Sequence, residues 1–543
     1  MARVEPHEHS SGKIEGRKAS PRWIVPPFFL FSLLGGAASS VEMESYSQIA
    51  CRAVAAADAT FPQPATAFST FLSNVGTGTD EEDWLAACRT SPEVQKRTTT
   101  IITSILLVAG TLSALTAAYW GAVADRRGRK LVLFVCSAAE LLEALIMILV
   151  LTFPNSFGYR SLLLLAAFAG LSGGELASMA VASAYLGDCA GVASKTQLLS
   201  NFEASLFAGL GLGPLIGSAF FRYTNLGPIG PYILMACARS VYLLAMPLMP
   251  ESLPPSMRSK PSTDPATPDR ALLLRTLALP KELVRPFRVL LPNKVEGGRK
   301  RDWRLLLVAV SGAMLLIVPG LGPVKVLYAR GKYGWGPTET GQWITFCSAC
   351  KLVLLLGVLP LVGRYLRGPA PLPAKSRPDD LNARAREEQI AWDAEAEQLK
   401  KQANAAYDLS LARWTILITS FGYLIMVSPL AGTSSTPFLV SSAVVSFASA
   451  TPPALQSLAL TLSGPEDAGK VLACLSALAT VSMSTIGPSA FGAAYVFAVD
   501  WWPELIFLLA AIWVGSALIP LLGVCVERLA QADDSDEDEL AEV

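Results

Sequence analysis

The sequence predicts an all-α membrane protein with twelve transmembrane helices, and three observations support this fold class. Hydrophobic residues make up 52% of the 543 residues and charged residues only 16%, and the mean hydropathy is +0.42. Twelve apolar stretches are long enough to cross a bilayer, which takes about 20 residues at 1.5 Å per residue. The charged residues gather between these stretches, a distribution typical of multi-pass membrane proteins and unlike that of soluble enzymes.

The apolar stretches fall into two groups of six, because a segment rich in Pro, Lys and Arg at 251–302 separates the sixth from the seventh. The expected spans are 23–41, 99–120, 130–152, 162–186, 203–221, 230–249, 304–328, 341–363, 412–431, 437–462, 470–498 and 503–525. The predicted domains are an N-terminal tail at 1–22, a first six-helix unit at 23–250, the central linker at 251–302, a second six-helix unit at 303–526 and an acidic C-terminal tail at 527–543.

Lysine and arginine predict the orientation of the chain. The N-terminal tail, the turn after the second span, the central linker and the segment after Arg364 are all basic and fall on one side if twelve spans alternate. Positive loops mark the cytoplasmic side, so both termini are expected in the cytoplasm. The first apolar stretch could also be a cleaved signal peptide, but its length and the eleven later spans favour a retained anchor. The membrane itself can be the plasma membrane or that of a vacuole or another organelle.

Two long insertions interrupt the pattern of spans. The external loop at 42–97 holds Cys51 and Cys88, which form a disulfide or remain two free thiols in an oxidising compartment. The cytoplasmic insertion at 367–409 has helix-forming composition and dense charge, so we expect a solvated helix lying near the membrane surface.

Five charged residues fall near the predicted bilayer midplane and are the candidate substrate and proton site. They are Glu140, Glu143, Glu175, Arg239 and Lys351. Each costs roughly 2.5 to 3.5 kcal/mol if it faces lipid, so we expect them to face a wet cavity or to pair with one another. Glu140 and Glu143 share a helical face, and repulsion between neighbouring carboxylates favours the binding of a proton by one of them. A purely structural pair of Arg239 with Glu143 or Glu175 is the alternative. The two basic residues suit an anionic substrate.

Several other functions are excluded or disfavoured. Both histidines, His7 and His9, lie in the N-terminal tail, so haem, di-iron and histidine-relay chemistry inside the membrane is excluded. No metal site, cofactor or nucleotide-binding loop is predicted, and the protein is not expected to be an enzyme. The balance of 44 basic and 44 acidic residues gives no sign of a nucleic-acid partner.

The sequence GAVADRRGRK at 121–130, between the second and third spans, resembles the signature loop of the major facilitator superfamily of secondary transporters. This resemblance implies two six-helix bundles around a central cavity and a protein that works as a monomer in the lipid bilayer. It also implies a cytoplasmic latch that stabilises the outward-facing state. The latch residues are Gly121, Asp125, Arg126, Gly128, Arg129 and Asp188.

A second motif, GLGLGPLIGS at 209–218, looks like the Gly-Pro helix-packing motif of facilitator antiporters, with Ser218 in place of the last glycine. Its matching residues are Gly209, Gly213, Pro214 and Gly217. Together with the sequence PES at 250–252, YLGDCAG and the long first loop, it resembles the tetracycline-type and proton-coupled folate transporter-like group. Drug exporters of this kind carry an arginine early in the fourth span, but residues 164–170 are uncharged here.

These patterns predict a secondary active transporter that moves a small organic solute together with protons by alternating access. One alternative is a proton antiporter that exports drugs or metabolites. An alternative of another class is a membrane sensor with the same fold that does not transport.

Overall fold

The computed structural model describes residues 19–57, 79–153, 159–189, 195–224, 226–253, 290–291, 302–366, 373, 383–428 and 434–524. Nearly all of the predicted N-terminal tail, most of the central linker and the acidic C-terminal tail lie outside these described residues. Every regular element in the described ranges is helical, which confirms the predicted all-helical fold.

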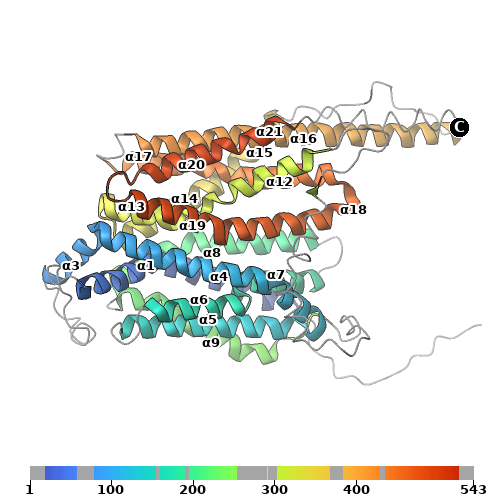
Figure 1. Cartoon of the computed structure of the whole chain (residues 1–543). Helices are drawn as coiled ribbons and strands as arrows, with labels where there is room; N and C mark the ends of the chain where they lie inside the picture. Colours follow the sequence, from blue (N-terminus) through green and yellow to red (C-terminus); the bar gives the residue numbers. More distant parts are fainter. Residues whose placement is uncertain are drawn as a thin grey trace, which may run out of the picture.

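Helices of the first half lie side by side in the lower part of Figure 1. They are α1 (Val25–Ala57), α4 (Pro92–Arg127), α5 (Arg129–Thr152), α6 (Tyr159–Leu171), α7 (Gly174–Cys189), α8 (Lys195–Tyr223) and α9 (Gly230–Ala245), with α3 (Thr79–Thr90) outside the bundle and short 3-10 turns at Pro21–Trp23, Gly227–Ile229 and Met246–Leu248. Helix α1 continues to Ala57, well beyond the predicted end of the first span, so the connection to α4 is partly helical.

Helices of the second half form the upper part of the same view (Figure 1). They are α12 (Arg304–Leu315), α13 (Gly322–Tyr333), α14 (Pro337–Val353), α15 (Leu359–Leu366), α16 (Ala383–Val427), α17 (Thr436–Val445), α18 (Thr451–Val481), α19 (Gly487–Ala498), α20 (Leu505–Ser516) and α21 (Leu518–Leu522). Short 3-10 or π segments join some of them: η5 (Val318–Leu321), η6 (Leu354–Val358), η8 (Ser446–Ala450) and η9 (Ser482–Ile486).

Within the described residues, eleven helical stretches are long and apolar enough to cross a membrane. The remaining predicted span, at 162–186, is present as two shorter helices, α6 and α7, because Gly173 and Gly174 take positive φ values of 90° and 56° between them. Such values suit glycine and break the helix. The carbonyl oxygens freed by the break accept hydrogen bonds from Thr116, Trp120 and Cys136, as a break inside a membrane requires.

The insertion contains the predicted solvated helix, but the prediction that this helix lies near the membrane surface as a separate element is wrong. Residues from Ala383 onward belong to α16, a single helix of 45 residues that continues into the ninth span. At 1.5 Å per residue it is about 68 Å long, more than twice the thickness of a hydrocarbon core. It extends beyond the bundle in line with the span (Figure 1). Between Ala383 and Val427 the chain has no proline and only one glycine, Gly422, so nothing turns the helix.

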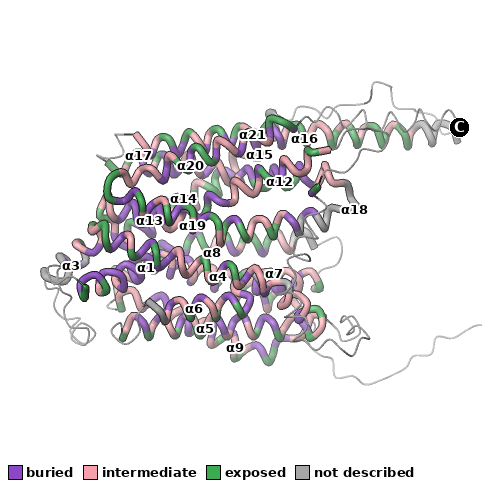
Figure 2. The backbone as a smooth tube through the Cα atoms, in the orientation of Figure 1, coloured by how far each residue is buried: buried purple, intermediate pink, exposed green. Residues whose placement is uncertain are grey.

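The bundle therefore has two distinguishable ends, which we name the α3 end and the α16 end. The α3 end is on the left of Figure 1 and the projecting part of α16 is on the right. Exposed positions recur along almost every helix (Figure 2), and many carry large apolar side chains, such as Leu164, Leu244 and Leu356. Exposed apolar surface of this extent is expected where helices face lipid.

The two halves meet through small residues on α4, α8, α14 and α19. A Cβ atom added at Gly341 of α14 would lie 2.6 Å from the carbonyl oxygen of Pro214 and 2.9 Å from Cβ of Ser218 on α8. Gly110 of α4 approaches Ser484 in the same way, with 2.6 Å to its Cβ. Close backbone approach of this kind is typical of membrane helices with small interfacial residues. Ser218, which replaces a motif glycine, faces Gly341, so the glycine is supplied by the other helix.

Helices α1 and α8 pack most closely of all, through the predicted helix-packing motif. Cβ atoms added at Gly209, Gly213 or Gly217 would each collide with the backbone of α1, for example 2.8 Å from the carbonyl oxygen of Phe29 in the case of Gly209. Pro214 lies inside α8, where it removes a backbone donor and favours a bend. The motif thus joins the first and fifth spans.

Replacing Gly217 by alanine should destabilise the protein, because the new methyl group would overlap the backbone of Ala37. Overpacking of this kind costs about 1 to 3 kcal/mol. The measurement is the apparent melting temperature of the detergent-solubilised protein. Gly35→Ala is the matched control, since a Cβ at Gly35 meets nothing within 4 Å. Equal melting temperatures for the two variants would contradict the close contact between α1 and α8.

Candidate functional site

A buried ion pair joins the two halves at the α3 end. Glu44 of α1 accepts a hydrogen bond from Arg330 of α13 at 2.8 Å, and the side chain of each residue is only 2% exposed. Arg89 of α3 approaches the same carboxylate at 3.4 Å. One buried carboxylate therefore faces two guanidinium groups. Breaking a buried pair by removing one partner typically costs about 3 to 5 kcal/mol, so this contact favours closure at the α3 end.

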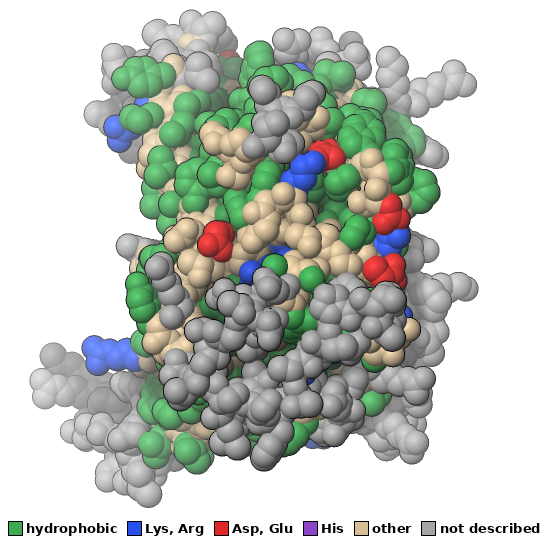
Figure 3. Space-filling model, turned by 90° about the vertical axis from the view of Figure 1, so that its left-hand side faces the viewer, with side chains coloured by type: hydrophobic (Ala, Val, Ile, Leu, Met, Phe, Trp, Pro, Cys, Tyr) green, Lys and Arg blue, Asp and Glu red, His purple; other side chains and the backbone are tan. Residues whose placement is uncertain are grey.

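Further contacts across the halves surround this pair. Tyr495 of α19 donates to Gln95 of α4 at 2.6 Å, and Lys96 pairs with Asp500. Acidic and basic side chains accordingly lie next to one another on the α3 end of the molecule (Figure 3). The structure also joins Cys51 and Cys88 by a disulfide, which ties α3 to α1 beside Arg89.

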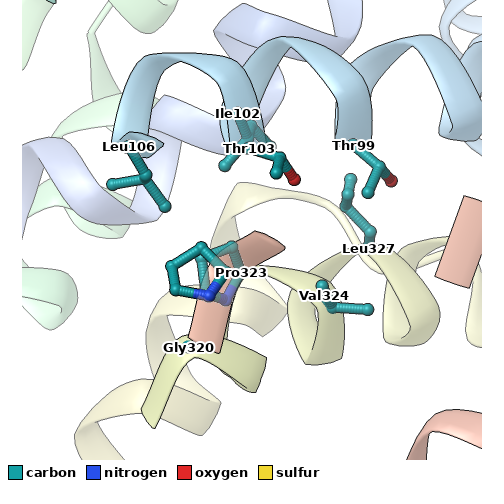
Figure 4. A pocket seen from close by; sticks show the side chains of 9 residues that line it. Thr99, Ile102, Thr103, Leu106, Gly320, Pro323, Val324 and Leu327 are labelled. Carbon is teal, nitrogen blue, oxygen red and sulfur yellow. The ribbon is translucent and has the colours of Figure 1, made fainter. Parts of the chain in front are cut away.

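A small crevice between the halves lies near these charges. Thr99, Thr103 and Leu106 of α4 face Gly320 and Pro323 of the second half across a crevice of only about 10 Å³ (Figure 4). This volume is about that of one water probe, so the crevice itself is too small for an organic solute.

A much larger cavity of about 770 Å³ lies deeper between the halves. Most of its wall comes from the second half, and Ser39, Glu42 and Met43 of α1 complete it. Val308, Gln456 and Leu475 also line the cavity. They belong to α12 and α18 and lie far from the α3 end of the spans that contain them, so the wall extends toward the other end of the bundle. Its volume is in the range of pockets that hold small organic molecules.

Two lysines supply the positive charge of this cavity. Lys325 of α13 is only 9% exposed, donates to the hydroxyl of Tyr423 at 3.3 Å and lies 4.6 Å from the centroid of that ring. Lys351 of α14 also lines the cavity, with Cys347 within electrostatic range of both lysines. Lys351 was predicted from the sequence, whereas Lys325 and Tyr423 were not. A lysine inside the apolar stretch 304–328 was the available signal for Lys325.

The predicted acidic cluster occupies the first half. Arg239 of α9 pairs with Glu140 of α5, and its guanidinium carbon lies 3.6 Å from the ring centroid of Phe31. Glu143 is within electrostatic range of both residues and of Glu175. The structural alternative in which Arg239 pairs with Glu143 or Glu175 therefore does not apply in this state. Glu175 lies in the first turn of α7, directly after the helix break, and is exposed.

Glu42 was not predicted as a site residue, because the predicted first span ends at residue 41. It lies on α1 between the acidic cluster of the first half and the two lysines of the cavity. Its carboxylate is within interaction range of Tyr46 and Glu143, and it lines the cavity that holds Lys325 and Lys351. Among the described lining residues, Glu42 is the only acid in this cavity.

The residues of the predicted latch meet at the α16 end of the first half. Arg129 pairs with Asp125 at 2.6 Å and with Asp188 at 3.4 Å, and Ser252 donates to Asp188 at 2.9 Å. Glu251 accepts the backbone N–H groups of Arg129 and Lys130, at 2.9 and 3.2 Å, which caps the start of α5. All of these groups belong to one half.

Three further latch residues differ in their surroundings. Gly128 joins α4 to α5 with φ of 110°, a value that requires glycine. A Cβ atom at Gly121 would meet nothing within 4 Å. Arg126 makes no ion pair or hydrogen bond with another described residue.

Comparisons with known proteins agree with this architecture. The family model described as Major Facilitator Superfamily matches residues 50–374. The MFS-type transporter avaJ of Aspergillus versicolor is 22% identical over 361 residues, which cover 66% of this chain and 65% of the relative. An uncharacterized membrane protein of Schizosaccharomyces pombe is 26% identical over 284 residues, which cover 49% of this chain and 43% of the relative. The chain thus spans less than two thirds of the length of these relatives.

Solved structures share the fold at low sequence identity. The human organic anion transporter MFSD10 superimposes with a TM-score of 0.53 at 16% identity, covering 92% of this chain and 99% of that protein. The peptide transporter POT in complex with alafosfalin gives a TM-score of 0.51 at 14% identity, covering 94% and 98%. The family model covers more than half of the chain, and the helical arrangement agrees with it. The chain therefore belongs to the major facilitator superfamily, whose members are secondary transporters.

Proposed function

We propose that this protein transports a small organic anion together with protons by alternating access. The cavity of about 770 Å³ between the halves carries this proposal, because its wall holds two lysines and a single carboxylate. With both lysines charged and Glu42 ionised, the described wall has a net charge of +1. Apolar and aromatic side chains, including Trp343 and Tyr423, form most of the remaining surface and suit the organic part of a solute.

Proton binding is assigned to the acidic cluster of the first half. Arg239 neutralises Glu140, whereas no described cation forms an ion pair with Glu143 or Glu175. Neighbouring carboxylates without cationic partners favour the uptake of a proton inside a membrane. The cluster belongs to the first half, whereas the cavity lies between the halves and takes most of its wall from the second, so a relative movement of the halves changes the surroundings of the cavity.

The orientation follows the positive residues of the sequence, with the α16 end in the cytoplasm. In this orientation the closed α3 end faces outward, the disulfide lies on the external side and the described state is inward-facing. The latch network then belongs to the cytoplasmic face and is formed within one half in this state.

Family membership favours transport over the alternative of a sensor. The sequence resemblance to the tetracycline-type and proton-coupled folate transporter-like group, and the fold shared with an organic anion transporter, support a solute of the proposed class. Export of drugs or metabolites in exchange for protons remains the second candidate, since the same cluster could serve antiport. The direction of proton movement separates the two.

Proton movement in proteoliposomes tests the coupling. With a pH-sensitive dye inside the vesicles, addition of pooled organic anions should acidify the lumen for the wild-type protein and not for Glu143→Gln. Glu203→Gln, at an exposed position of α8, is the control and should behave as the wild type. Alkalinisation of the lumen when substrate is added outside would identify antiport. Substrate flux without any proton movement would contradict the coupling.

Removal of a cavity lysine tests the anionic substrate. Lys325→Met should weaken the binding of a transported anion by about 2 kcal/mol, roughly 30-fold, because one buried charge contact is lost. Binding is measured by ligand-induced thermal stabilisation of the purified protein. Lys332→Met is the matched control on the same helix, since Lys332 pairs with Glu504 outside the cavity. Unchanged affinity in Lys325→Met would contradict the assigned site.

The buried pair at the α3 end should control access to the crevice of Figure 4. Glu44→Gln leaves Arg330 without its carboxylate, which should destabilise the closed α3 end by about 3 to 5 kcal/mol. A Thr103→Cys probe, with the other unpaired cysteines replaced by serine, should then react with an impermeant maleimide. The probe should stay protected when Glu44 is intact.

Two controls accompany this experiment. Glu93→Gln removes a carboxylate from the exposed first turn of α4 and should leave the Thr103→Cys probe protected. A probe at the exposed Thr100 should react in every background. Equal protection of Thr103→Cys with and without Glu44 would show that the pair does not hold this end closed.

A further inference from the structure

Among the described carboxylates, Glu42 is distinguished by its position between the acidic cluster of the first half and the two lysines of the cavity. It lines the central cavity with Lys325 and Lys351, and it also lies within electrostatic range of Glu143 in the acidic cluster. The cavity is lined by none of the three carboxylates of the cluster, Glu140, Glu143 and Glu175. Glu42 is therefore the place where a bound proton and a bound anion can influence one another directly.

The groups around Glu42 come from several helices. Tyr46 of its own helix and Tyr232 of α9 are both within electrostatic range of it. On the side of the acidic cluster lie Glu140 and Glu143 of α5, Glu175 of α7 and Arg239 of α9. Across the cavity are Lys325, Lys351 and Tyr423.

The arrangement leaves the carboxylate without a cationic partner. Arg239 is paired with Glu140, and in the described part of the chain no ion pair links Glu42 to either lysine. The lysines and Glu42 instead border the same open volume from opposite halves. An anion in that volume lies between two positive charges and one negative charge.

We propose that Glu42 couples proton binding to anion binding, and that its protonated form is the one that admits the anion. This inference rests on the proposed function and deepens it. Protonation of Glu42 changes the net charge of the described wall from +1 to +2 and removes repulsion of the substrate. The ionised form repels the anion and favours its release. The acidic cluster, through Glu143, lies on the route by which the proton reaches Glu42.

The test is the pH dependence of anion binding to the purified full-length protein. The probes are methanesulfonate, benzenesulfonate and naphthalene-2-sulfonate, three organic anions of increasing size whose charge does not change in this range, and binding is measured by thermal stabilisation between about pH 5 and pH 8. The wild-type protein should bind the best probe roughly tenfold more tightly at the acidic end, as expected for removal of one nearby charge. Glu42→Gln should bind tightly at both ends and lose the dependence.

Two variants separate coupling from a structural role. Glu42→Asp keeps a carboxylate and should restore the pH dependence, and Glu143→Gln should retain the pH dependence of binding because Glu42 is intact. In proteoliposomes, Glu42→Gln should still exchange anions across the membrane but should not accumulate them against a gradient.

The possible failures are distinguishable. If the wild-type protein binds no anion at any pH, the proposed substrate class is wrong and the inference is overturned with it. If the wild-type protein binds anions with a pH dependence that persists in Glu42→Gln, the inference alone is overturned. A Glu42→Gln variant that binds weakly at every pH would show that Glu42 shapes the cavity without coupling.

Discussion

The buried pair between Glu44 and Arg330 is the interaction on which the described state of the molecule depends. A buried charge that loses its partner is strongly destabilised, and Arg330 has the carboxylate of Glu44 as its partner only while the two halves touch at the α3 end. Arg89 joins the pair from α3, and the disulfide between Cys51 and Cys88 keeps α3 beside α1. Closure at this end leaves the large cavity in the centre of the molecule, with walls that continue toward the other end.

The halves that meet at this pair are otherwise joined by small side chains. Gly110, Gly341 and Ser218 allow close backbone contact, and they leave few interlocking side chains at those positions. The contact between the halves therefore consists of specific charges at the α3 end and of small side chains packed along the helices. Such a contact can separate at the α3 end without unfolding either half. By contrast, the glycines of α8 hold α1 within the first half, so α1 moves as part of that half and carries Glu42 and Glu44 with it.

Long apolar stretches and the basic turn at 121–130 were sufficient to predict the helical membrane fold and the family. Patterns of this kind are local, so one sequence contains them. The pair of Glu44 and Arg330 joins residues 286 positions apart, and no local pattern indicates it. Glu42 and Glu44 were placed in a loop because polar residues ended the apolar stretch, whereas α1 continues to Ala57. The buried contact with Arg330 of the second half stabilises Glu44 inside the helix, and Glu42 faces the central cavity. Likewise, the apolar stretch at 162–186 predicted one span, whereas Gly173 and Gly174 take positive φ values and divide it into two helices.

The break at Gly173 and Gly174 gives α7 a particular place in the first half. Glu175 lies at its first turn, within electrostatic range of Glu140, and Asp188 lies in its last turn, paired with Arg129. One helix of 16 residues, about 24 Å long, therefore connects the acidic cluster to the network at the α16 end. The first turn of α7 packs among the carboxylates of the first half, and its last turn packs beside the basic turn that follows α4. Because the break ends α6 before Glu175, this connection is made by α7 alone and not by an unbroken fourth span. The glycines that interrupt the span therefore decide which charged groups share one helix.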